Sequence, residues 1–129
     1  MSILLKASFV YFGVEDETLL IGFADDEYET NEYVLFQKSL YIEDIPILNK
    51  VHITLNSETR SEYGGILKIT LSQKLISIYL SKETARSLGV DGSINIEYDI
   101  DEERYNALIS YFNKLNVDQE IEITYVPYL

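Results

Sequence analysis

The chain contains three consecutive segments that decide its fold: Thr18-Leu-Leu-Ile-Gly-Phe-Ala24, Asp25-Asp-Glu-Tyr-Glu-Thr-Asn-Glu32 and Tyr33-Val-Leu-Phe-Gln-Lys38. Apolar residues occupy both alternating sets of positions in the first segment, which predicts a central strand covered on two sides. The β-rich composition of the third segment predicts a strand that returns antiparallel to the first. The acidic second segment is then a connector between two core strands.

Alternating apolar residues predict further strands on both sides of this hairpin. Residues 2–12 form one expected strand, with Ile3, Leu5, Ala7, Phe9 and Tyr11 on a shared face. Later strands are expected at residues 51–55, 66–72, 75–81, 93–100 and 120–125, and those at 66–72 and 75–81 are expected to form a hairpin. Proline at position 46 and glycines at 64 and 65 predict loops over residues 44–48 and 57–65.

Two helices are predicted by capping residues and apolar spacing. Ser81 is placed to cap a short helix that runs through Leu88 and ends at Gly89. Asp99 or Asp101 caps a longer helix, whose apolar stripe comprises Tyr105, Leu108, Ile109, Phe112 and Leu115. Tyr98, Tyr105 and Tyr125 are expected at the core or its edge, with their hydroxyls reaching water.

These elements predict an α+β fold: a mainly antiparallel, curved β-sheet of about eight strands, with one long helix packed on a face and one short helix. The length of 129 residues and the hydrophobic content of 47% suffice for a sizeable core. We expect residues 1–129 to form a single domain.

Charge is distributed unevenly along the chain. The 22 acids and 10 bases give a formal net charge of −12. Six bases and three acids lie between Lys50 and Arg86, so this segment carries +3 and the remainder −15. The span between Lys6 and Lys38 contains no base and eight acids: Glu15, Asp16, Glu17, Asp25, Asp26, Glu27, Glu29 and Glu32. This balance disfavours nucleic acids and anionic membranes as partners and favours basic ones.

The cysteine count and the amino terminus bear on location. The chain has no cysteine, which excludes disulfides and thiolate metal sites and is typical of a reducing cytoplasm. Residues 1–6 lack a basic start followed by a long apolar run, and no apolar segment approaches the roughly 20 residues that span a bilayer. We therefore expect a cytoplasmic protein whose mature chain is the encoded one.

Catalytic signatures are missing from the sequence. No phosphate-binding glycine loop and no His-Glu-x-x-His motif occurs. His52 is the sole imidazole, and its place on an alternating strand points it away from Val51, Ile53 and Leu55, as a surface or edge residue. A nucleophilic triad would need a serine beside His52, and no pattern places one there. We predict no catalytic residues and no cofactor.

The acidic connector admits three interpretations. Its carboxylates could bind calcium, but the spacing lacks the alternating Asp/Asn pattern, the central glycine and the terminal glutamate of an EF-hand loop. It could instead be a solvated loop that keeps the protein soluble. A third interpretation is an interface for a basic protein, because rigid aromatic anchors among like charges suit such a surface. The residues of this expected partner-binding site are Asp25, Asp26, Glu27, Tyr28, Glu29, Glu32 and Tyr33.

Four stretches carry a family resemblance: Thr18–Glu29, Tyr33–Ser39, Glu62-Tyr-Gly-Gly-Ile66, and Leu80–Gly89 with the strand and helix that follow. Through them the chain resembles the immunity protein 10 family of bacterial polymorphic toxin systems over nearly its whole length. The resemblance implies a small cytoplasmic protein that binds and neutralises a cognate toxin. It supplies no toxin-contacting residues, so the expected site depends on charge and aromatic residues alone.

The combined hypothesis is a non-enzymatic immunity protein that neutralises a bacterial toxin through an acidic surface containing tyrosines. A nuclease with a basic surface is one candidate for that toxin. Two alternatives belong to other classes. One is a small-ligand or calcium-binding module, and the other, less favoured, is a carboxylate-dependent enzyme. Neither nucleic acid nor membrane is an expected partner, and the sequence leaves self-association open.

Overall fold

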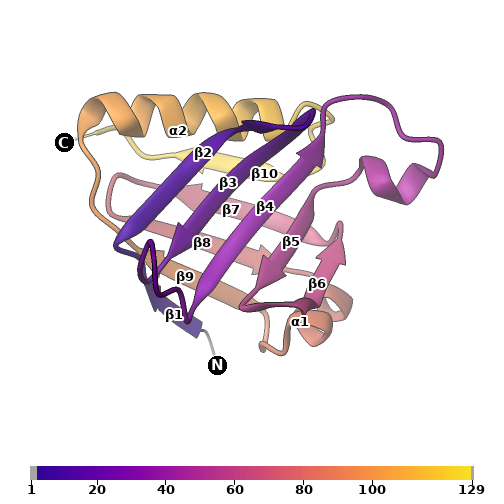
Figure 1. Cartoon of the computed structure of the whole chain (residues 1–129), viewed down its shortest axis with the longest axis horizontal. Coiled ribbons are helices and arrows are strands. Elements are labelled where there is room, and N and C mark those ends of the chain that lie inside the picture. Colours follow the sequence, from indigo (N-terminus) through magenta and orange to yellow (C-terminus); the bar gives the residue numbers. More distant parts are fainter. Residues whose placement is uncertain (1–2, 129) are drawn as a thin grey trace.

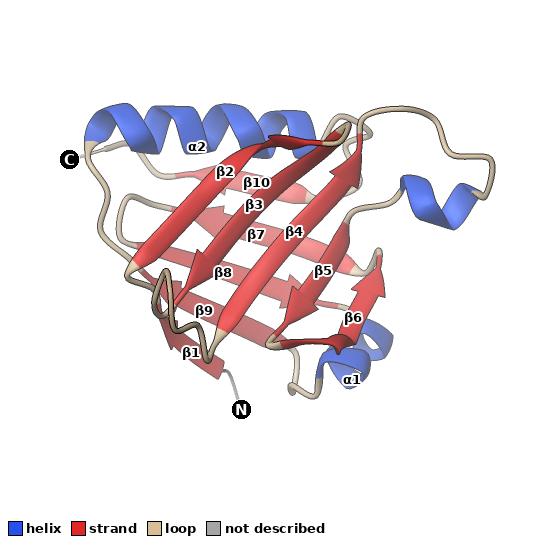
Figure 2. Cartoon of the chain, viewed as in Figure 1, coloured by secondary structure: helices blue, strands red, loops and turns tan. Residues whose placement is uncertain are grey.

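The computed structural model describes residues 3–128, which form two five-stranded sheets packed face to face (Figures 1 and 2). The first, which we call the front sheet, is antiparallel throughout and contains, in order, β2 (Phe9–Glu15), β3 (Thr18–Ala24), β4 (Tyr33–Ser39), β5 (His52–Leu55) and β6 (Ser57–Tyr63). The back sheet contains, in order, β1 (Ile3–Lys6), β9 (Ser93–Glu97), β8 (Leu75–Leu80), β7 (Ile66–Leu71) and β10 (Glu122–Tyr125). Strands of the two sheets cross steeply, the arrangement of an orthogonal sandwich.

Helices occupy the margins of the sandwich. The long helix α2 (Glu102–Leu115) contacts β2 and β3 of the front sheet at the end beyond β10, and the short helix α1 (Lys82–Leu88) packs against β6. A 3-10 turn, η1 (Pro46–Asn49), stands away from both sheets (Figure 2). The predicted α+β class is therefore correct, but the prediction of one curved sheet of about eight strands is wrong: the described residues contain ten strands in two sheets.

The first additional strand arises because residues 2–12 do not form one strand. The chain changes sheets at Ala7 and Ser8: the Ala7 amide donates to the Glu97 carbonyl of β9 at 2.8 Å, and the Ser8 amide donates to the Ala24 carbonyl of β3 at 3.0 Å. The crossing between the sheets also changes which alternate residues face the core. Leu5 is buried before the crossing and Val10 after it. The expected common face through Phe9 and Tyr11 is consequently wrong.

The second additional strand is β6, which falls in the segment expected to be a loop. Its sequence, Ser-Glu-Thr-Arg-Ser-Glu-Tyr, has no buried residue and no apolar alternation. It pairs with β5 at the edge of the front sheet and is covered by α1, where the Arg60 guanidinium donates to the Leu88 carbonyl at 2.8 Å. An edge strand can have such a polar composition because it pairs with a neighbouring strand on one side only. Among the described residues six of the eight strand pairs are antiparallel, which agrees with the mainly antiparallel prediction; the parallel pairs, β1 with β9 and β10 with β7, lie at the margins of the back sheet.

The central hairpin of β3 and β4 forms as predicted, with Ile21 opposite Phe36 and Gly22 opposite Leu35. The prediction that β3 is covered on two sides is wrong. Leu19, Ile21 and Phe23 are buried between the sheets, whereas Leu20 and Gly22 on the outer face are only half-buried. No second layer covers that outer face in the described part of the chain, so β3 is central within its sheet but covered on one side.

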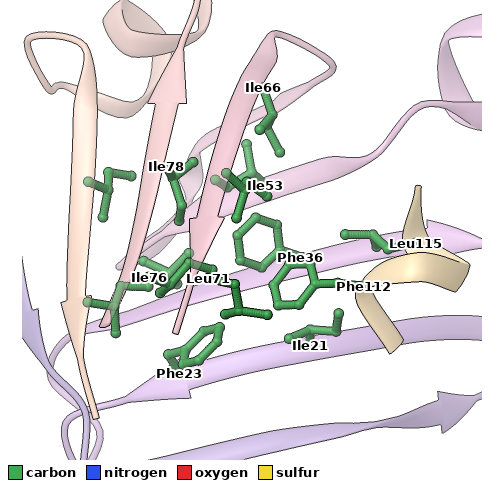
Figure 3. Packing of buried hydrophobic residues seen from close by; sticks show 14 of the residues in the cluster. Ile21, Phe23, Phe36, Ile53, Ile66, Leu71, Ile76, Ile78, Phe112 and Leu115 are labelled. Atoms are coloured by element: carbon green, nitrogen blue, oxygen red, sulfur yellow. The ribbon is translucent and has the colours of Figure 1, made fainter. Parts of the chain in front are cut away.

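One hydrophobic cluster joins both sheets and α2. Phe36 lies near its centre and meets Phe112 of α2 edge-on, with ring centroids 5.4 Å apart and an interplanar angle of 76° (Figure 3). Both predicted helices form. Asp101 caps α2 by accepting from the Arg104 amide at 2.8 Å, and Ser81 caps α1 by accepting from the Thr84 amide at 3.2 Å.

Two of the three tyrosines expected near the core differ from expectation in one respect. Tyr98 and Tyr105 are buried, but their hydroxyls donate to backbone carbonyls rather than reaching water: Tyr98 to Ser72, and Tyr105 to Leu71 and Val126. Burial raises the pKa of both phenols above the usual value. Half-buried Tyr125 donates to the Asn113 side chain at 2.6 Å.

Candidate functional site

The candidate site is the acidic loop, residues 25–32, which joins β3 to β4 and projects from one end of the front sheet (Figure 1). The strands on either side hold its base in place. The Asp25 amide donates to the Glu32 carbonyl at 3.0 Å, continuing the pairing of β3 with β4 by one step. The Ser8 hydroxyl donates to the Asp25 carbonyl at 2.6 Å, which ties the loop to β2.

Two of the predicted site carboxylates fold the loop. Asp25 accepts from the amides of Asn31 and Glu32 at 3.0 and 3.2 Å, and the bond from Glu32 followed by that from Asn31 lowers the pKa of Asp25 below its usual value. Asp26 accepts from the amides of Tyr28 and Glu29 at 3.0 and 2.9 Å. These bonds fix the loop backbone in one conformation, so Asp25 and Asp26 organise the surface.

The other members of the predicted set face outward. Glu27, Glu29 and Glu32 are exposed, and none of their carboxylates bonds to another residue between positions 3 and 128. Tyr28 is 87% exposed at the tip. The structure therefore brings six of the seven predicted residues together in one loop. Tyr33 lies at its end, half-buried, with its amide held by the Asn56 side chain at 2.8 Å.

An apolar hollow of about 230 Å³ lies next to the acidic loop, on the uncovered outer face of the front sheet. Its walls combine side chains of β2, β3 and β4 with two residues of the loop; among them are Phe9, Tyr11, Tyr33, Leu35, Glu27 and Thr30. Sequence reasoning missed the hollow because it expected both faces of β3 to be covered. The signal was present in the sequence as apolar residues on both alternating sets of these strands.

Several basic side chains are engaged away from the acidic loop. The ion pairs among residues 3–128 join Lys38 to Asp118 at 3.2 Å, Lys50 to Glu120 at 2.8 Å and Lys68 to Glu122 at 3.7 Å. The Arg104 guanidinium donates to the Val10 carbonyl at 2.6 Å. Lys50 and Lys68 of the basic middle thus pair with acids near the carboxyl end, and none of these three ion pairs uses a carboxylate of the acidic loop.

His52 lies on the outer face of β5, as its alternation predicts. Its ring is half-buried against Tyr63, with centroids 4.4 Å apart, and Nδ1 lies 3.2 Å from the Gln37 side-chain oxygen. Burial lowers the pKa of His52, although Glu62 opposes that shift. Ser39 and His52 both line a second small hollow, but the Ser39 hydroxyl donates to the Tyr41 carbonyl at 3.1 Å. The hydrogen bonds of His52 and Ser39 are therefore structural.

Two further observations concern metals and membranes. Within residues 3–128, no three side chains of His, Asp or Glu gather closely enough to hold a metal ion. Asp25 and Asp26, the first carboxylates considered for calcium, turn toward amides of their own loop. Over the same residues, no helix combines the length and hydrophobicity that crossing a bilayer requires.

Comparison with protein families assigns the chain to a known one. A family model described as Immunity protein 10 matches residues 6–106, more than three quarters of the chain. The matched region includes the whole front sheet, the acidic loop and the first three stretches that carry the resemblance. Of the fourth stretch it includes Leu80–Gly89 and the strand that follows, and it ends within the first turns of α2. No curated protein matches the chain.

Proposed function

The chain belongs to the immunity protein 10 family, and from this membership we propose that it is a non-enzymatic inhibitor that binds and neutralises a cognate bacterial toxin. It acts in the cytoplasm as the immunity partner of a polymorphic toxin system, protecting the cell that makes it. Binding alone is sufficient for this role, because a protein that occupies a toxin's working surface blocks it without chemistry.

The observation that carries the proposed binding surface is the uncompensated acidic loop beside the apolar hollow. Glu27, Glu29 and Glu32 supply negative potential that steers a basic partner. Tyr28 supplies a rigid aromatic anchor, and the hollow offers apolar surface to be buried. The partner that fits is a toxin with a basic surface, and a nuclease fits well because its substrate cleft must attract phosphates.

Growth protection tests the proposed function. A tagged copy of the chain, purified from its native cells, identifies the bound protein by mass spectrometry. The toxin domain so identified is then expressed from an inducible promoter in a bacterial host that lacks both genes. We expect the toxin domain alone to stop growth, and co-expression of the chain to restore it.

The control is the same host expressing the chain with a toxin domain of another family, which the chain should leave active. Growth arrest that persists when the folded chain is present in excess over its captured partner would contradict the proposed function. A thermal shift on adding calcium, without any effect on the captured protein, would favour the ligand-binding alternative.

A further inference from the structure

Residues 40–47, which we call the apolar ridge, expose more hydrophobic surface than any segment of similar length in the described chain. The exposed fractions are 51% for Leu40, 52% for Tyr41, 90% for Ile42, 58% for Ile45 and 45% for Ile47. Single exposed apolar residues are ordinary, but five within eight consecutive positions are a concentration of exposed apolar surface of the kind that marks interaction sites. The ridge follows β4 and stands clear of both sheets together with η1 (Figure 1).

Polar contacts hold the apolar ridge in one shape. The Asn49 side chain bridges the segment by accepting from the Glu43 amide at 2.7 Å and donating to the Glu43 carbonyl at 3.2 Å. The Ser39 hydroxyl donates to the Tyr41 carbonyl at 3.1 Å. At the base, the buried ammonium of Lys38 donates to the Asn49 carbonyl and pairs with Asp118. A segment ordered before binding loses less conformational entropy when a partner covers it.

Acidic residues lie within and beside the apolar ridge. Glu43 and Asp44 lie within it, and the Leu40 amide donates to the Glu17 carbonyl at 2.9 Å, which places the Glu15–Glu17 turn alongside. Two ridges brought together would set these acids against each other in a chain whose net charge is −12. Anionic lipid would be repelled for the same reason. A protein surface with an apolar depression and basic residues around it is the complementary occupant.

We infer that the apolar ridge is a second contact surface for the toxin, inserting its isoleucines into an apolar depression rimmed by basic side chains. This inference rests on the proposed function, because it assigns a further part of the chain to the same partner. The ridge and the acidic loop lie at opposite ends of β4, roughly 20 Å apart for a seven-residue strand. An interface of standard size covers about 800 Å² of each protein, which is about 30 Å across and wide enough to include both.

The test compares Ile42→Ser and Ile45→Ser with Leu67→Ser, measuring the Kd for the purified toxin domain identified above. Leu67 is a matched control because it is 56% exposed on β7 of the back sheet. We expect each ridge variant to bind about tenfold more weakly or worse, mainly through faster dissociation, while Leu67→Ser stays within about twofold of wild type. Circular dichroism should show all three variants folded.

The outcomes separate this inference from the proposed function. If the wild-type chain protects cells and both ridge variants bind as tightly as wild type, the inference is wrong and the proposed function stands. If the wild-type chain fails to neutralise the toxin domain, the proposed function fails first. A wild-type dimer in sedimentation velocity that Ile42→Ser converts to monomer would make a second copy the occupant and overturn the inference.

A photoreactive residue at position 42 provides a readout independent of affinity. We expect irradiation of native cells to join it to the same protein that the tagged chain captures, and the same residue at position 67 to give no such adduct. An adduct at position 67 but not at position 42 would contradict the inference.

Discussion

Replacing Gly65 by alanine should lower the free energy of unfolding by about 3–5 kcal/mol, a large part of the stability of a domain this size. Gly65 links β6 of the front sheet to β7 of the back sheet, with φ at +83°. A Cβ added there would lie 1.8 Å from the Thr84 hydroxyl oxygen and 2.7 Å from that of Ser81. Thr84 is buried, and Ser81 caps α1, so neither side chain can yield without loss. Urea unfolding with linear extrapolation measures the change.

Gly64→Ala is the matched control, because Gly64 has φ at +80° but meets only the flexible side chain of Lys50, at 3.0 Å. Its expected cost is about 1–2 kcal/mol, from the strained backbone alone. The difference between the two variants therefore isolates the contact with α1. Equal destabilisation by both substitutions would show that α1 does not pack against this link as described.

Replacing Glu27, Glu29 and Glu32 together by glutamine should slow association with the toxin by about tenfold at low salt, with a smaller effect on dissociation. Glutamine keeps the size of each side chain, and these carboxylates make no bond to residues 3–128 that the change would break. The difference from wild type should shrink as salt rises, since screening shortens the Debye length to about 3 Å at 1 M. Stopped-flow association across a salt series provides the measurement.

The control replaces Glu83, Glu102 and Glu103 by glutamine, which makes the same change in net charge on the two helices. We expect it to reduce the association rate far less, because steering depends on where the charges lie. Equal slowing by the two triple variants would assign the effect to net charge and remove the acidic loop as the site. Asp25 and Asp26 are unsuitable for this comparison, because their substitution would also disorder the loop.

The parts of the fold that the sequence predicts are those with local signals. The apolar run at residues 18–24 and the β-rich composition of residues 33–38 predict the β3–β4 hairpin, and capping residues predict both helices, with Ser81 and Asp101 bonded as expected. Each signal acts within a few residues, because strand periodicity and helix caps are local properties of the chain.

The division into two sheets depends on contacts between distant residues. The change of sheet at Ala7 and Ser8 uses backbone bonds to Glu97 and Ala24, which no local pattern encodes. β6 is a strand because β5 and α1 provide partners for polar residues that resemble a loop in sequence. Parallel pairing of β10 with β7 likewise joins segments more than fifty positions apart.

The sequence predicts that the residues of the acidic loop lie together. It does not predict which of them fold the loop and which face outward. Charge and aromatic residues identified residues 25–33, whereas the bonds that make Asp25 and Asp26 structural depend on the backbone of the folded loop. Pro46 predicts only a loop over residues 44–48, which includes part of the apolar ridge. The available signal for the ridge was its composition: it contains five large apolar residues without helix or strand periodicity.

The central claim, that the chain neutralises its toxin by binding alone, is tested most directly by titrating the purified toxin domain with the purified chain and measuring toxin activity. A stoichiometric inhibitor predicts that activity falls linearly and reaches its minimum at a fixed molar ratio, unchanged by longer incubation. Loss of activity that continues with time at substoichiometric amounts of the chain, or full activity when the chain is in excess, would contradict the claim.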